Sequence, residues 1–150
     1  MLKKTAVVLL VLFIGLQFYR PAKNLSPAPG KADLAVAHSV PMEVQAILRQ
    51  ACYDCHSNHT VYPWYAEVQP VRWWLDSHIR DGKRHLNFST FGAYDKKRAV
   101  KKLNELIEEV ETGHMPPPSY TWMHRDARLT PAQVQLLVTW AEETVDASTE

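Results

Sequence analysis

The sequence predicts an all-α protein, and three observations support this prediction. Apolar residues recur at the helical spacing i, i+3, i+4 and i+7 in several segments of the second two-thirds of the chain. No segment alternates apolar and polar residues as a half-buried strand does. Proline, glycine and capping residues stand where these segments should begin and end. With 150 residues, 46% of them hydrophobic, the chain has enough material for one folded domain.

The first twenty residues have the character of an export signal. Lys3 and Lys4 precede an apolar run over residues 5–19 that carries no charge, and Arg20 and Pro21 close it. This run is shorter than the roughly 20 residues that span a bilayer comfortably. No small-x-small cleavage site follows it directly, so we expect residues 1–20 to be an uncleaved membrane anchor, with a cleaved signal peptide as the alternative. The two lysines would then stay in the cytoplasm and the rest of the chain would lie outside.

The remaining chain divides into a linker and a domain. Residues 21–40 are rich in Pro, Ala, Lys and Ser without apolar periodicity, and are expected to form a tether. The alternative is that this segment belongs to the fold. We expect the folded domain over residues 41–146.

Four helices are expected in the domain. The first begins near Pro41, and its apolar stripe consists of Val44, Ile47, Leu48 and Ala51. The second covers residues 71–81, carries Trp73, Trp74 and His78, and ends at Gly82. Between the second and third helices, residues 87–92 are expected to form a loop with Phe88 and Phe91 as anchors.

The third and fourth helices have clear end signals. The third covers residues 95–112, with Gly113 as its cap, an apolar stripe through Leu103, Leu106 and Val110, and a charged face expected to be solvated. The fourth opens with a capping box from Thr130 to Gln133 and continues through Leu137 and Trp140.

The chemical centre of the sequence is Cys52-Tyr53-Asp54-Cys55-His56. C-x-x-C-H is the attachment pattern of a c-type haem. Two cysteines three residues apart on a helical turn face the same way, so both thiols can form thioethers with one haem while His56 ligates the iron. Three alternatives are open: a zinc site that adds His56 and His59, a thioredoxin-like redox pair, and an unreactive reduced pair.

A second axial ligand is expected from the other side of the haem. Met115 is the first choice, because the prolines after it restrict its loop and a thioether ligand suits electron transfer. The alternatives are His78, then His114 and His124, or simple packing of Met115 against the core.

Other side chains are candidates for covering the haem or pairing with its propionates. Seven aromatic residues can cover the flat face, although each can equally be ordinary core: Trp64, Tyr65, Trp73, Trp74, Tyr120, Trp122 and Trp140. Four cations near one another are candidate propionate partners: Arg72, Arg80, Lys83 and Arg84.

Two family resemblances rest on these residues. The helix before C-x-x-C-H, the Gly113–Pro117 loop and the closing helix with Leu137 and Trp140 resemble class I c-type cytochromes, whose first and last helices cross. Residues 43–143 more closely resemble the haem-binding domain family of bacterial exported proteins. The matching segments are A-C-Y-D-C-H-S-N, Y-P-W-Y, V-R-W-W, H-I-R-D-G-K-R-H-L-N-F-S, M-P-P-P-S-Y and W-A-E-E. This likeness implies a cytochrome c-like domain with one covalent haem c and His56 as an axial ligand.

The leading functional hypothesis is therefore a monohaem c-type cytochrome that transfers single electrons. It is expected at the bacterial inner membrane, facing the periplasm and held through residues 5–19, or free in the periplasm if the signal is cleaved. Its partner would be a redox protein of unknown identity. The alternative is a haem-based sensor or binding module with a weak or open sixth site. An enzyme such as a peroxidase is less favoured, because no distal acid–base pair is recognisable. The net charge of +1 offers no basic excess for nucleic acid.

Overall fold

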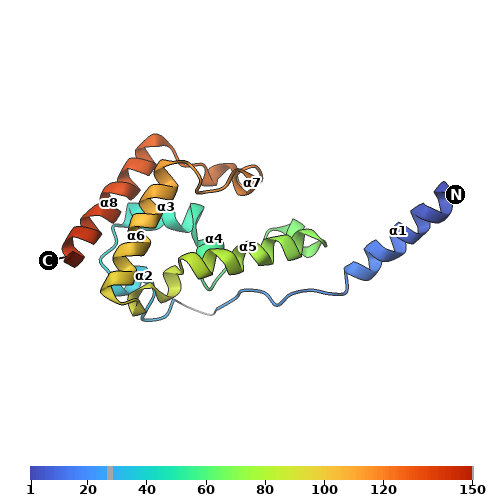
Figure 1. Cartoon of the computed structure of the whole chain (residues 1–150), viewed down its shortest axis with the longest axis horizontal. Helices are drawn as coiled ribbons and strands as arrows, with labels where there is room; N and C mark the ends of the chain where they lie inside the picture. The colour runs from blue at the N-terminus through green and yellow to red at the C-terminus, as the bar shows by residue number, and fades with distance from the viewer. Residues whose placement is uncertain (27–28, 150) are drawn as a thin grey trace.

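The computed structural model describes residues 1–26 and 29–149, and within them it contains helices but no β-strand. One isolated antiparallel bridge joins Leu25 to His59. The two ends of the chain lie at opposite ends of the molecule (Figure 1). The longer helices are α1 (Leu2–Leu16), α3 (Met42–Ala51), α5 (Val71–His85), α6 (Lys96–Glu111) and α8 (Pro131–Thr149), and the short helices are α2 (Leu34–Ala37), α4 (Tyr53–His56), η1 (Trp64–Glu67), η2 (Phe88–Ala93), α7 (Pro118–Thr121) and η3 (Arg125–Ala127). The all-helical prediction is confirmed.

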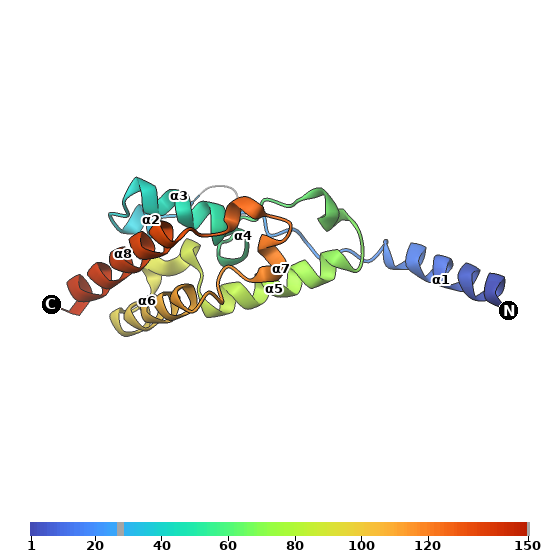
Figure 2. The same ribbon diagram turned by 90° about the horizontal axis from the view of Figure 1, so that it is seen from above.

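The main core lies where α3, α6 and α8 meet. Helices α6 and α8 lie side by side, and α3 packs against α8 (Figures 1 and 2). The apolar stripe predicted for the first helix is buried. Its Val44, Ile47 and Leu48 lie in one cluster with Leu137 and Trp140 of α8. The expected meeting of the first and last domain helices is therefore found.

Two helix-end signals predicted from the sequence are found in the structure. Thr130 and Gln133 form the predicted capping box: Gln133 Oε1 accepts from the Thr130 N–H at 2.9 Å, and Thr130 Oγ1 accepts from the Gln133 N–H at 3.3 Å. Gly113 follows α6 with φ of +71°, the left-handed conformation that glycine adopts without strain. Phe88 and Phe91 of η2 are each 1% exposed, so they anchor this segment as predicted.

Helix α5 is longer than the sequence predicted. It passes through Gly82 and ends at His85. Gly82 is needed for close approach and not for termination, because a Cβ built on it would lie 2.8 Å from the carbonyl oxygen of Cys55. Helices α4 and α5 therefore touch through their backbones.

The predicted linker is largely part of the fold, which corrects the expectation of a free tether. Leu34 in α2 is fully buried in the main core, and Asp33 before it caps α2 by accepting a hydrogen bond from the Ala35 N–H at 3.0 Å. Residues 21–24 also make hydrogen bonds to the domain. Leu34 and Val40 are buried but do not recur at a helical or strand spacing, so the sequence shows no pattern for this segment.

The apolar N-terminal run forms helix α1, which projects from the end of the molecule opposite the C-terminus (Figure 2). None of its residues is buried. No helix in the described residues combines the length and apolar character that a membrane crossing requires.

Candidate functional site

The C-x-x-C-H residues lie at the junction of α3 and α4. Cys52 ends α3 with φ of −126° and ψ of −40°, which breaks the helix direction. Its carbonyl then accepts hydrogen bonds from the N–H groups of Cys55 at 3.2 Å and His56 at 2.9 Å. This single turn brings both cysteines and His56 to the same cavity.

The cavity has a volume of about 390 Å³, within the range of about 300–1,000 Å³ typical of ligand sites. Residues of α4, α5, α6 and the loop that leads into α7 line it. Figure 2 shows how these elements are arranged. Cys52, Cys55, His56 and Met115 all line it, although 59 residues separate the last two in the sequence. Its apolar walls come from Ala51, Leu86, Phe88, Leu106, Val110, Pro116 and Pro117.

His56 is held in the tautomer that a metal ligand needs. Its Nδ1–H donates to the Leu86 carbonyl at 3.0 Å, so Nε2 keeps its lone pair. Burial lowers the pKa of His56 below its ordinary value, and the backbone hydrogen bonds only partly oppose this effect. The side chain is therefore neutral at pH 7 and able to ligate a metal.

The two thiols are protonated at neutral pH. Burial, with a smaller contribution from Cys55, raises the pKa of Cys52 to about 12. Burial, followed by the charge of Asp54, raises the pKa of Cys55 to about 11. Both cysteines are free and partly exposed in the cavity wall. A raised pKa disfavours thiolate reactions such as those of a redox-active pair.

Met115 lies in the loop between α6 and α7. Its N–H donates to the Glu109 carbonyl at 3.0 Å, which ties this loop to the end of α6. The residue is 38% exposed and lines the cavity. Among the alternatives, His78 also lines the cavity and donates its Nδ1–H to the Trp74 carbonyl at 2.8 Å, whereas His114 and His124 do not line it.

The zinc alternative finds no support in the geometry. His59 is exposed, does not line the cavity, and its Nδ1–H donates to the Ser26 carbonyl at 2.8 Å. In residues 1–26 and 29–149, no three His, Cys, Asp or Glu side chains are grouped to hold a metal ion.

The structure places the seven candidate aromatic residues in different surroundings. Of the seven candidate residues, Tyr120 lines the cavity and the other six do not. Trp64 and Trp122 are largely exposed, and Trp140 belongs to the main core. Phe88, which the sequence analysis named only as a loop anchor, also lines the cavity, and it packs on Tyr53 and His56. An aromatic residue's position in the sequence does not show which side of a helix the cofactor occupies.

None of the four cations predicted as propionate partners lines the cavity, and their pairing with propionates stays a prediction. Arg72 donates to the Pro21 carbonyl, Lys83 to Asn24, and Arg80 and Arg84 pair with Asp76 and Asp81. The cation that lines the cavity is Lys102 of α6, at 2.5 Å from Glu105. Lys102 had been expected on a solvated face.

Tyr120 connects the far wall to the C-x-x-C-H turn. Its hydroxyl donates to Asp54 Oδ2 at 2.8 Å, and its ring stacks on His124 with centroids 4.3 Å apart. Burial and the Asp54 carboxylate raise the pKa of Tyr120, so it stays a hydrogen-bond donor at all ordinary pH values. Asp54 therefore holds α7 against the cysteine turn.

The fold and this cavity define a helical domain in which one histidine and two cysteines of a single turn line a ligand-sized cavity. The chain matches the family model for a haem-binding domain over residues 11–143, and it belongs to that family. This membership supports haem as the ligand of the cavity, and the donor set fits the group because His56 offers a free nitrogen beside two thiols. No curated protein and no solved structure matches the chain.

Proposed function

We propose that this protein is an exported, membrane-tethered monohaem c-type cytochrome that carries single electrons. The observation that carries the proposal is the meeting of Cys52, Cys55, His56 and Met115 at one cavity. The proposed location is the bacterial inner membrane with the domain facing the periplasm. The proposed partner is a redox protein there, and no catalytic role is assigned to the chain.

The chain's residues divide the work of holding the cofactor. Cys52 and Cys55 would hold the haem covalently: each S–H would add across one vinyl C=C, with sulfur bonded to one carbon and hydrogen to the other. No oxidant is needed for this addition. His56, through Nε2, and Met115, through its thioether, are the side chains that would hold the iron. When bound, the haem supplies a reversible one-electron couple at its iron.

The protonated state of the thiols bears on how attachment occurs. With pKa values of about 12 and 11, both thiols carry almost no thiolate at pH 7. Uncatalysed attachment should therefore be slow, which agrees with the need for a dedicated maturation system outside the cytoplasm.

A second candidate is a haem-based binding module with a weakly held sixth site. Its specific support is that Met115 is 38% exposed in a loop and that a second candidate ligand, His78, lines the same cavity. Rapid binding of carbon monoxide by the reduced protein would favour this function. Absence of binding would favour the electron carrier.

The first experiment is to express the full chain with a cytochrome c maturation system and record a pyridine haemochrome spectrum after denaturation. A c-type band that stays with the polypeptide, and is lost in a Cys52→Ala, Cys55→Ala variant, is the expected result. The matched control is His59→Ala, which changes an exposed histidine outside the cavity and should keep the band. Haem that extracts into acidic solvent would overturn covalent attachment.

A further inference from the structure

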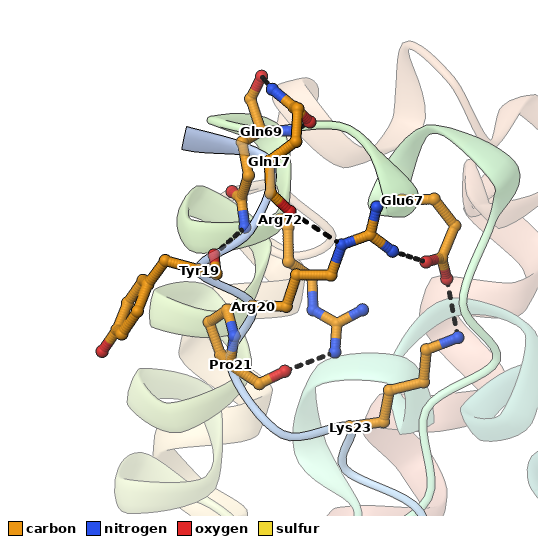
Figure 3. A network of polar contacts seen from close by, with 8 residues as sticks. All are labelled: Gln17, Tyr19, Arg20, Pro21, Lys23, Glu67, Gln69 and Arg72. Atoms are coloured by element: carbon orange, nitrogen blue, oxygen red, sulfur yellow. Dashed lines mark hydrogen bonds and ion pairs between the residues drawn. The ribbon is translucent and has the colours of Figure 1, made fainter. Parts of the chain in front are cut away.

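The segment that follows α1 is bound to the domain along its length. We call residues 17–24 the strap. Gln17 donates its Nε2–H to the Phe13 carbonyl at 3.0 Å within α1, and its Oε1 accepts from the Gln69 N–H at 2.9 Å. One side chain thus belongs to both α1 and the domain, as Figure 3 shows for Gln17 and Gln69.

Backbone carbonyls of the strap are bound by buried or partly buried donors of the domain. The Tyr19 carbonyl accepts from Gln69 Nε2 at 2.7 Å and from the Trp73 indole N–H at 3.0 Å. The Pro21 carbonyl accepts from Arg72 at 2.7 Å (Figure 3). Gln69 is 1% exposed and Arg72 is 3% exposed, so loss of the strap would leave both with unmet hydrogen-bonding needs.

Ion pairs also join the strap to the domain. Glu67 of η1 contacts Arg20 at 3.0 Å and Lys23 at 2.6 Å through its two oxygens. These three side chains are each about half exposed, so the pairs add little stability by themselves. They do join the strap to η1 at two of its residues (Figure 3).

The strap ends at the haem-site turn. Asn24 donates to the carbonyl of Ser57, the residue after His56, at 2.9 Å, and accepts from Lys83 of α5 at 2.6 Å. An unbroken series of contacts therefore joins the end of α1 to the C-x-x-C-H turn.

The strap keeps the domain closer to α1 than a free linker would. Twenty extended residues could hold the domain as much as roughly 65 Å from a membrane. Here the contacts to the domain begin at Gln17, directly after α1. A helix of 15 residues is about 22 Å long, which is less than the hydrocarbon thickness of about 30 Å. Hydrophobic mismatch of this sign draws the flanking residues into the headgroup region.

The elements at this end of the domain carry exposed side chains suited to that region. Phe18 is 85% exposed beside the strap contacts, Trp64 of η1 is 77% exposed, and Trp74 of α5 is 44% exposed. Tryptophan and other aromatic side chains favour the membrane–water interface. Arg20 and Lys23 stay about half exposed while they pair with Glu67, so their charges lie at this same surface.

We propose that the end of the domain formed by the strap, η1 and the first turn of α5 rests on the phospholipid surface, with the domain held in one orientation by the strap. The partner of this surface is a lipid bilayer interface. The inference rests on the proposed function, since it requires α1 to remain as a membrane anchor.

The test uses the haem-loaded full chain in phosphatidylcholine vesicles and compares it with a spacer variant. The variant has about eight Gly/Ser residues inserted between Leu16 and Gln17. The two ends of such a flexible segment lie about 16 Å apart on average. This insertion leaves the contacts of residues 18–24 to the domain in place. It separates the domain from α1 and removes the hydrogen bonds of the Phe18 and Tyr19 N–H groups to the Gly15 and Leu16 carbonyls. A control carries the same insertion between Pro29 and Gly30, both exposed and beyond the strap.

Vesicle flotation and hydrogen–deuterium exchange are measured on all three proteins. We expect all three to float, and we expect amides of residues 61–70 to exchange about tenfold more slowly in the wild type and the Pro29–Gly30 control than in the Leu16–Gln17 spacer variant. Amides of α8, which lies at the end of the molecule opposite α1 in Figure 2, should not differ.

Two results would overturn the inference, and they are distinguishable. If all three float and exchange equally over residues 61–70, the anchor holds but the domain does not rest on the surface. If none floats, or if intact mass shows that α1 has been removed, the membrane-anchor part of the proposed function fails and the orientation fails with it.

Discussion

Gly82 of α5 lies directly against the carbonyl of Cys55 in α4. A Cβ atom at position 82 would lie 2.8 Å from the Cys55 oxygen and 3.2 Å from its carbon. Backbone atoms of a hydrogen-bonded turn cannot yield as a flexible side chain can. The position of the second cysteine therefore depends on a glycine 27 residues further along the chain.

Gly82→Ala should displace the C-x-x-C-H turn from α5. We expect a loss of about 1–3 kcal/mol in the free energy of unfolding, as for other overpacked sites, together with reduced covalent haem loading. Denaturant unfolding of the haem-free chain and haem content per polypeptide measure the two effects. Gly30→Ala is the matched control, because nothing lies within 4 Å of a Cβ at that exposed position. Equal stability and loading in the two variants would contradict the contact.

Met115→Ala tests the proposed sixth ligand. Loss of a thioether ligand should lower the reduction potential by on the order of 100 mV or more, because axial ligands set haem potentials over about 0.8 V. A potentiometric titration and the oxidised absorption spectrum measure the change. Met123→Ala serves as control, since Met123 is 46% exposed and does not line the cavity. An unchanged potential and spectrum in Met115→Ala would favour His78 or an open site.

The sequence predicted the C-x-x-C-H turn and Met115 at one site, but not the other residues that line it. Cys52, Cys55 and His56 share one turn, so their spacing alone brings them together. Met115 was predicted from its proline-rich loop, and the structure brings it to the same cavity. The helices with complete apolar stripes and end signals, such as α3 and α8, were found where expected.

The features that the sequence missed depend on contacts without a periodic pattern. The strap is held through backbone carbonyls and the side chains of Gln17 and Gln69, which leave no recurrent apolar signal. One ridge of α6, beside the buried Leu106 and Val110, carries Lys102, Glu105 and Glu109. All three of these charged residues line the cavity. Their charge pattern resembles an ordinary solvated face, so only the tertiary structure reveals their position.

The raised thiol pKa values predict slow alkylation of the folded, haem-free chain. At pH 8, a thiol with pKa of about 11 has about a hundredth of the thiolate found at the ordinary value of 9.0. Iodoacetamide should therefore modify Cys55 about a hundredfold more slowly in the folded chain than in denaturant. The folded rate should rise about tenfold per pH unit up to about pH 11, since the thiolate fraction rises with pH below the pKa. Peptide mass spectrometry over a pH series measures both rates.

The haem-loaded protein supplies the control for this experiment. Thioether sulfurs carry no ionisable hydrogen, so the loaded and then denatured protein should take up no iodoacetamide at either cysteine. Alkylation of both cysteines at the denatured rate after loading would show that the haem is not attached through them. Equal folded and denatured rates in the haem-free chain would contradict burial of the thiols.

Lys102 and Lys101 form a natural comparison for the electrostatics of the cavity. Both lie near Glu105, at 2.5 Å and 3.7 Å, but the Lys102 side chain is 14% exposed and lines the cavity, whereas that of Lys101 is 71% exposed. A positive charge near the haem stabilises the reduced form, which has one positive charge fewer, and this interaction is stronger where water is excluded. Lys102→Gln should therefore lower the reduction potential, and Lys101→Gln should change it little because solvent screens an exposed charge. Raising the ionic strength should reduce any effect of Lys101→Gln and leave most of the Lys102→Gln effect. Equal shifts in the two variants would show that Lys102 does not face the cofactor.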